Sequence, residues 1–336
     1  MSCRVLETPI CELFECRYPI LQAGMGGVAR ARLAAAVSNA GALGCLGMVR
    51  ESPEFIREQV HKVRSLTERP FGVNLIPSAT DPVQFHAELD ECIRLRVPVM
   101  SFFWSVATDA IKKAKDAGCI VIYQVGNAED AVLAEEAGAD VIVAQGFEAG
   151  GHVHGTVGSL VLIQDVCDAV SVPVVASGGF SSGRSLVAAI ALGAQGIQVG
   201  TAFVATEESF AHLMHKQRIV DSQASDTLYT DAFAINWPPG SPVRVLRSEE
   251  TVELESQPLG HLPDEAARQQ VAEEGGRPIY LMSTDSPLQS MTGDLHRLAM
   301  YAGQVTGQIK QVASAASVVQ RMVDEARQVL SNLRIQ

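Results

Sequence analysis

One pattern repeats along the chain: a short, almost uninterrupted apolar run is followed by a segment with helical spacing. Runs of this kind are typical of strands that are buried on both faces in a parallel sheet. The candidate strands are Pro19–Ala23, Ala42–Gly47, Phe71–Ile76, Pro98–Phe103, Cys119–Val125, Asp140–Gly146, Pro173–Gly179 and Gly196–Phe203. Glycine turns that resemble helix C-caps come directly before three of them, at Ala117–Cys119, Ala137–Ala139 and Leu192–Ala194.

Such a repeat, with eight strands in about 200 residues, predicts a (β/α)8 barrel of the TIM type. A doubly wound sheet with fewer strands is the alternative. The alternation stops near Thr206, so we expect a barrel in residues 1–205, an inserted substrate or lid domain in 206–297, and C-terminal helices in 298–336 that pack back on the barrel. Apolar positions from Gln304 to Leu333 fall close to one face of a long helix, which covers the barrel or makes a homo-oligomer contact.

Composition limits the partners. The 336 residues include 26 Lys and Arg against 38 Asp and Glu, a net charge of −12, and form no basic stripe. We therefore expect binding to neither nucleic acid nor a membrane surface. Seven cysteines without a C-x-x-C pair fit a reducing compartment. Since no segment has the pattern of a signal peptide or the length of a membrane span, we expect a soluble, cytoplasmic protein.

A glycine-rich loop follows the first predicted strand. Gly24, Met25 and Gly26 open a segment that ends at Ala29 and matches G-x-G-x-x-A, a dinucleotide-binding pattern. The acidic residue that would bind the ribose is missing after the second strand, where Gly47–Arg50 stands. We therefore favour the other interpretation, in which glycine lets a cofactor ring approach the backbone.

Two more glycine turns lie at the ends of neighbouring strands. Ser177, Gly178 and Gly179 end the seventh strand, and Gly200 and Thr201 fall in the eighth. In barrels, the loops after these two strands commonly bind phosphate through backbone N–H groups. The alternative is that each glycine only relieves a tight turn. The pair of turns favours the phosphate site.

A histidine follows the sixth strand. Gly150 and Gly151 precede His152, at the strand end where barrel enzymes carry catalytic side chains. Histidine exchanges protons near neutral pH, so His152 is the candidate catalytic residue. His152 and His154 lack a third ligand nearby, and we expect no metal site. His212 and His215 are expected on a solvated helix face.

With these motifs the chain resembles the nitronate monooxygenase family, which also includes flavin-dependent enoyl-ACP reductases and an NADH:quinone reductase. The matching segments are PILQAGM from Pro19, GVN at Gly72–Asn74, QGFEAGGH at 145–152, ASGGF at 176–180, GTAF at 200–203 and YAGQ at Tyr301–Gln304. The resemblance implies an FMN-binding barrel with a smaller substrate domain.

The resemblance also implies roles for these residues. The first loop (Gly24, Met25, Gly26) and Asn74 would face the flavin ring or the ribityl chain, and Gly150 and Gly151 would lie over the ring. The phosphate would be held by Ser177, Gly178, Gly179, Gly200 and Thr201. Gln124, at the end of the fifth strand, would contact the flavin where some relatives carry a lysine. A neutral amide stabilises negative charge on a reduced flavin less than a lysine does.

The implied substrate is a nitronate anion, either propionate nitronate or an alkyl nitronate. It is oxidised to a carbonyl product and nitrite, with FMN as electron acceptor and O2 as oxidant. His152 would orient and neutralise the nitronate, or deprotonate a neutral nitroalkane. Met25, Phe102, Phe103 and Trp104 would wall the pocket or pack in the core. One alternative is an NAD(P)H-dependent reductase of an enoyl thioester or a quinone, and another is a flavin-binding protein without catalysis.

Overall fold

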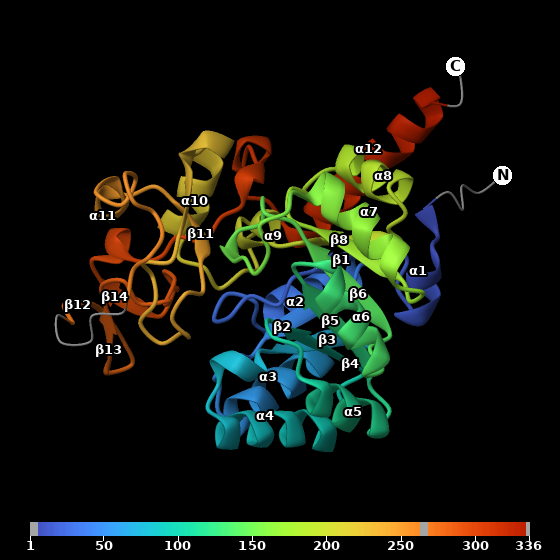
Figure 1. Ribbon diagram of the computed structural model, residues 1–336, viewed down its shortest axis with the longest axis horizontal. Coiled ribbons are helices and arrows are strands. Elements are labelled where there is room, and N and C mark those ends of the chain that lie inside the picture. Colours follow the sequence, from blue (N-terminus) through green and yellow to red (C-terminus); the bar gives the residue numbers. More distant parts are fainter. Residues whose placement is uncertain (1–5, 263–267, 334–336) are drawn as a thin grey trace.

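The computed structural model describes residues 6–262 and 268–333. Eight parallel strands form one sheet in the order β1-β9-β8-β6-β5-β4-β3-β2. They are β1 (Ile20–Gln22), β2 (Gly44–Gly47), β3 (Phe71–Leu75), β4 (Val99–Phe103), β5 (Ile120–Val125), β6 (Val141–Gln145), β8 (Val174–Ser177) and β9 (Gly196–Val199). A parallel bridge between Leu21 and Leu43 joins β1 to β2 and closes the sheet. The predicted barrel is confirmed, and the doubly wound alternative is wrong (Figure 1).

Helices between the strands cover the outside of the barrel (Figure 1). They are α2 (Ala31–Asn39), α3 (Pro53–Leu66), α4 (Pro82–Arg94), α5 (Thr108–Asp116), α6 (Ala128–Glu136), α7 (Ser159–Ala169) and α8 (Gly183–Ala191); η2 (Pro77–Ala79) is a short turn before α4. Side-chain caps fix several of their starts: Ser52, Asp81 and Asn127 each accept a backbone N–H of the first turn. The helices' apolar faces join the outward side chains of the strands in the main core.

The inside of the barrel is apolar at one end and polar at the other. Inward side chains such as Leu21, Val143 and Val175 pack against Ile10 of α1 (Pro9–Leu13) and Phe14, which directly follows this helix, at the amino ends of the strands. Toward the carboxyl ends, the buried side chains are polar: Gln22, Asn74, Ser101, Gln145, Ser177 and Gln198. The chain therefore closes one end of the barrel and keeps hydrogen-bonding groups at the other.

The eighth barrel strand ends earlier than predicted. The backbone leaves the extended conformation at Gly200, with φ −106° and ψ −74°, and Thr201–Val204 is the short helix α9. The C-terminal prediction was also too long. Gln304–Gln308 is the separate 3-10 turn η5, and the long helix α12 (Ala315–Leu333) begins where the Ser314 side chain accepts the N–H of Ser317.

The segment between α9 and α12 forms several short helices and, together with β7 from the loop after β6, two small antiparallel sheets to one side of the barrel (Figure 1). One sheet contains β10 (Thr227–Thr230), β11 (Val243–Leu246) and β7 (Gly151–His152), and the other β12 (Gln270–Glu274), β13 (Arg277–Tyr280) and β14 (Met291–Gly293). The helices are α10 (Leu213–Asp221), η3 (Ala224–Asp226), α11 (Glu249–Val252) and η4 (Leu295–Arg297). Because β7 belongs to the loop after β6, the first sheet ties that loop to the inserted segment.

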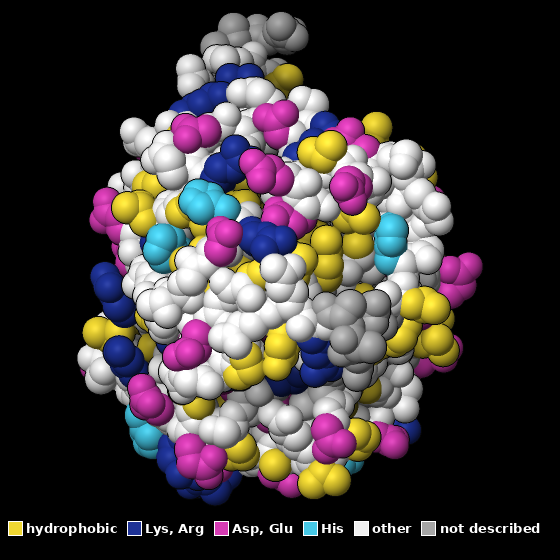
Figure 2. All heavy atoms as spheres, turned by 90° about the vertical axis from the view of Figure 1, so that its left-hand side faces the viewer, with side chains coloured by type: hydrophobic (Ala, Val, Ile, Leu, Met, Phe, Trp, Pro, Cys, Tyr) yellow, Lys and Arg dark blue, Asp and Glu magenta, His cyan; other side chains and the backbone are white. Residues whose placement is uncertain are grey.

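None of the described helices is long and apolar enough to cross a bilayer. On the face turned toward the viewer in Figure 2, acidic and basic side chains are scattered among neutral ones.

Candidate active site

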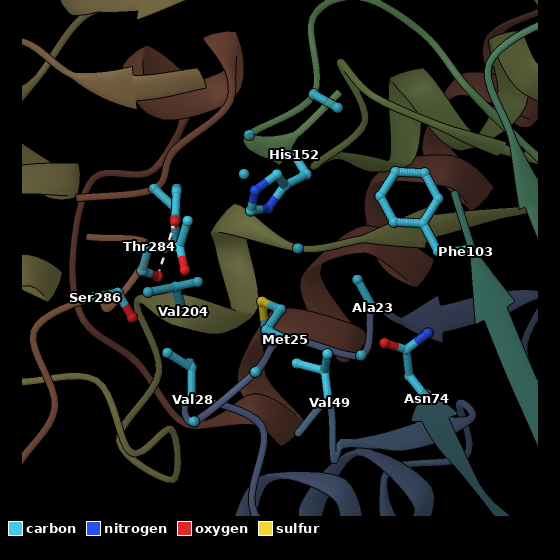
Figure 3. A pocket seen from close by; sticks show the side chains of 18 of the residues that line it. Ala23, Met25, Val28, Val49, Asn74, Phe103, His152, Val204, Thr284 and Ser286 are labelled. Atoms are coloured by element: carbon cyan, nitrogen blue, oxygen red, sulfur yellow. Dashed lines mark hydrogen bonds between the residues drawn. The ribbon is translucent and has the colours of Figure 1, made fainter. Parts of the chain in front are cut away.

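A cavity of about 740 Å³ lies at the carboxyl ends of the barrel strands and is also bordered by the inserted segment. Its lining includes every catalytic and cofactor-binding residue expected from the sequence: Gly24, Met25, Gly26, Asn74, Gln124, Gly150, Gly151, His152, Ser177, Gly178, Gly179, Gly200 and Thr201. Figure 3 shows Ala23, Met25, Val49 and Asn74 along one side and His152 across from them. The parallel strands thus bring residues far apart in sequence to one place.

The loops after β8 and β9 provide free backbone donors. Among the described residues, no hydrogen-bond acceptor is found for the amides of Gly179, Phe180 and Gly200. Gly178 and Gly179 have φ of 82° and 86°, the left-handed region that favours glycine. A Cβ on Gly178 would lie 2.6 Å from the carbonyl oxygen of Gly146. This arrangement fits a phosphate group, because donors without partners need an external acceptor.

Gly24 has a different reason for being glycine. A Cβ at this position would collide with the Cβ of Asn74 on β3. The Asn74 amide in turn donates to the Ser101 carbonyl on β4 at 3.1 Å. Packing inside the protein therefore requires Gly24 and holds Asn74 in place at the edge of the cavity.

Amide side chains form the floor of the cavity. Gln198 on β9 donates its Nε2 to Oε1 of Gln124 on β5 at 2.5 Å, so this carbonyl is already engaged across the barrel. Gln145 on β6 donates to the backbone carbonyl of His152 at 2.9 Å. The floor is therefore polar and uncharged, and it also anchors the histidine.

His152 is held by an aromatic cluster. Its imidazole stacks on Trp237 with ring centroids 3.5 Å apart and an angle of 16° between the planes, and the edge of Trp104 packs against it at 6.0 Å. Its backbone pairs with Val243 of β11. The Nε2 atom is buried and has no hydrogen-bond partner in the described part of the chain. Burial, and then the positive charge of Arg50, hold the pKa of His152 well below its ordinary value.

Several lining residues were not expected from the sequence. Arg50 follows β2, while Trp237, Thr284 and Asp285 come from irregular parts of the inserted segment. Tyr301 belongs to the YAGQ motif, but the motif gave no sign of its place in the cavity. These residues lie in polar or turn-rich stretches, where no periodic pattern marks a buried position.

The prediction for His215 was wrong. The residue is 1% exposed, and its Nε2 lies 3.0 Å from the carbonyl oxygen of Tyr301. His212 instead starts α10, where its Nδ1 accepts the N–H of Met214. The helix is short, and its buried face packs against η5 and Tyr301 instead of facing water. Of the four expected wall residues, Met25 and Phe103 line the cavity, whereas Phe102 is fully buried in the core and Trp104 packs behind His152.

A closed parallel barrel with a polar cavity at the carboxyl ends of its strands defines an enzyme of the TIM-barrel class. The sequence model of the family "Nitronate monooxygenase" matches residues 7–325, and the chain belongs to this family of oxidoreductases, which are typically flavin-dependent.

Individual proteins are similar to this chain over nearly its whole length. A probable nitronate monooxygenase of Staphylococcus haemolyticus is 33% identical over 95% of this chain and 96% of its own length. The structure of FabK from Thermotoga maritima has a TM-score of 0.82 and 32% identity over 98% of both chains. A nitroalkane oxidase from Streptomyces ansochromogenes has a TM-score of 0.79 and 30% identity over 96% of this chain and 99% of its own.

Proposed function

We propose that this protein is an FMN-dependent nitronate monooxygenase, which oxidises small alkyl nitronates with O2 to carbonyl products and nitrite. The observation that carries the proposal is the placement of His152. A neutral imidazole with an unpartnered nitrogen lies in the same cavity as a set of free backbone donors. Unsatisfied buried polar groups of this kind are typical of a site that completes its hydrogen bonds with a ligand.

The cofactor assignment rests on the free amides after β8 and β9. In this proposal Ser177, Gly178, Gly179, Gly200 and Thr201 hold the single phosphate of FMN, and Gly24, Met25, Gly26, Asn74, Gln124, Gly150 and Gly151 lie along the rest of the molecule. When bound, FMN supplies two-electron redox chemistry and, once reduced, reactivity toward O2. Release of FAD from the denatured protein, instead of FMN, would contradict the assignment.

The low pKa of His152 favours a nitronate over a nitroalkane as substrate. A neutral nitroalkane must lose a proton from carbon, and the best general base has a pKa near the working pH. Because the pKa of His152 lies well below its ordinary value, the imidazole is neutral but weakly basic. A nitronate has already lost this proton. His152 then donates a hydrogen bond that orients the anion, and it acts as a base only when the substrate is a neutral nitroalkane.

Apolar side chains on the cavity wall favour a substrate with an alkyl group. Met25, Val49, Ile76 and Phe103 border the cavity with apolar surface.

We also propose that residues 206–297 form the substrate side of the site, on a barrel built from 1–205 and covered by 298–336. This division explains why the cavity takes residues from both the strand ends and the inserted segment.

A second candidate is a reductase that takes electrons from NADH or NADPH and passes them to an enoyl thioester or a quinone. The similarity to FabK over nearly the whole of both chains favours it. The two functions differ in the electron donor. The test is to add ethylnitronate, NADH or NADPH to the flavin-loaded protein without oxygen and to follow the flavin absorbance. Bleaching by ethylnitronate, with nitrite released in air, supports the monooxygenase; bleaching only by a nicotinamide supports the reductase.

A further inference from the structure

Arg50 brings a positive charge into the cavity. It follows β2 and lines the cavity, with its guanidinium half-buried. Nη1 donates to the backbone carbonyl of Asn236, and Nη2 donates to Oγ1 of Thr284 at 3.3 Å. The guanidinium carbon lies 5.6 Å from the centre of the Trp237 ring, the same ring on which His152 stacks. All of these partners are neutral.

Arg50 forms no ion pair with any described residue, in contrast to the other arginines of the cavity. Arg30 lies 3.6 Å from Glu274, and Arg277 lies 3.2 Å from Glu274 and 2.9 Å from Asp285. Asp285 and Glu51 act on Arg50 only at longer range. Arg50 therefore lacks the counter-ion that its neighbours have. A charge withdrawn from water is costly unless it is paired, so an anionic ligand would stabilise Arg50.

Arg50 and its hydrogen-bond partner Asn236 both have an unusual backbone conformation. Arg50 has φ +60° and Asn236 has φ +73°, a region that residues other than glycine rarely adopt. These two residues are joined by the hydrogen bond from the Arg50 guanidinium. Strained conformations persist where the surrounding structure enforces them, and they concentrate at functional sites. The two residues with positive φ thus meet at the wall of the cavity, where the guanidinium of Arg50 lies.

We propose that Arg50 binds the negatively charged group of the substrate and makes this cavity selective for small organic oxyanions. The proposal rests on the function proposed above and names the residue that recognises its substrate. A planar guanidinium matches a planar group with two oxygens, as in a nitronate. The hydrogen bonds to Asn236 and Thr284 fix the orientation of the guanidinium, and Figure 3 shows Thr284 on the cavity wall. The positive charge of Arg50 also lowers the pKa of His152.

The first test compares charged and neutral substrates in Arg50→Gln, Arg50→Lys and a control. The control is Arg96→Gln, because Arg96 also has a positive φ (52°) but is exposed and outside the cavity. Hydrogen bonds to charged groups contribute enough that Arg50→Gln should raise KM for ethylnitronate about 10- to 100-fold. KM for freshly dissolved nitroethane, which is neutral when it binds, should change less than about threefold, and Arg50→Lys should recover part of the loss for ethylnitronate. Arg96→Gln should match wild type.

Equal losses on both substrates, or losses in Arg50→Lys as large as in Arg50→Gln, would show that Arg50 only braces the Asn236 and Thr284 segments. Flavin content and melting temperature of each variant report such a structural role directly. A shifted pH profile adds a further readout, since Arg50 helps to lower the pKa of His152. Removal of its charge should let His152 protonate at a higher pH.

A second measurement separates this proposal from the proposed function. Nitrate, a planar oxyanion that cannot be oxidised here, is titrated into the flavin-loaded protein by calorimetry. We expect binding by wild type and a dissociation constant about 10-fold or more higher for Arg50→Gln. If wild type binds nitrate through Arg50 but oxidises no nitronate, the anion site stands and the proposed function fails. Equal binding of nitrate by wild type and Arg50→Gln would overturn the anion site.

Discussion

The behaviour of His152 at the residue scale follows from its burial and its aromatic neighbours. Trp237 and Trp104 fix the plane of the ring, and the hydrogen bond from Gln145 fixes the backbone. The imidazole is therefore preorganised and neutral before any substrate arrives. The loops that we propose to bind the phosphate lie on other strands, so loss of the side chain should spare the cofactor.

We predict that His152→Ala retains FMN and loses activity unequally. General acid–base contributions are typically about 10²–10⁴-fold, so turnover of nitroethane should fall within this range. Oxidation of ethylnitronate should fall less, because no proton leaves carbon. Steady-state rates at matched flavin content measure both losses. Equal and small losses would make His152 a bystander, and equal, large losses would assign it to binding the anion.

His215 makes a separate prediction about stability. Burial lowers its pKa from 6.5 to about 4, so the unfolded chain takes up a proton before the folded one. The free energy of unfolding should then decrease as pH falls from about 6.5 to 4, by up to about 3 kcal/mol from this residue. Urea unfolding across this range should show a shallower decline for His215→Gln. His61→Gln, at an exposed position on α3, is the control and should follow wild type.

The sequence anticipates the site residues that lie at strand ends and misses the others. His152 and Gly178 could be expected at one cavity because parallel strands in a barrel all end at one rim. Arg50 and Thr284 could not, since their meeting depends on how the inserted segment folds over that rim. His215 was misjudged because two histidines on a short polar helix carry no signal of burial.

At the scale of elements, the apolar runs located all eight barrel strands, since burial on both faces leaves a strong pattern. Elements with weak patterns were missed. In the sheet of β12, β13 and β14, strands such as Gln270–Glu274 have mostly polar, partly exposed residues. Strand β7 has only two residues. The end of the eighth strand was also predicted wrongly, because a short, mostly apolar segment such as GTAF fits a strand and a helix equally well.

The loop into α9 gives a clean test of the phosphate site. A Cβ on Gly200 would meet nothing closer than 3.8 Å, and the residue does not need a positive φ. We therefore predict that Gly200→Ala keeps FMN, whereas Gly200→Asp loses it, because a carboxylate would repel the phosphate at close range. Flavin absorbance per protein measures retention. Gly178 is a poorer choice, since its Cβ would itself distort the loop. Full retention by Gly200→Asp would move the phosphate elsewhere.

At the scale of the whole molecule, α12 completes the barrel. Directly after the last barrel strand, β9, the chain forms only the four-residue helix α9. The long helix α12, near the C-terminus, packs against α8 and α2. It lies beside α8 in Figure 1. The approach is close, since a Cβ on Gly183 would collide with the backbone of α12. The helix thus occupies the position of the missing eighth barrel helix.

We predict that truncation of a side chain in this interface lowers stability without changing the site. Met322 is fully buried on α12, and replacing it with alanine should lower the free energy of unfolding by about 2–5 kcal/mol. Leu333→Ala is the matched control on the same helix: Leu333 is 60% exposed, so the change should stay within about 0.5 kcal/mol. Denaturant unfolding gives both values, and KM for ethylnitronate should remain at the wild-type level in each. If Met322→Ala costs no more than Leu333→Ala, α12 is not part of the barrel core. If it raises KM, the helix also supports the cavity, which its position on the outside of the barrel argues against.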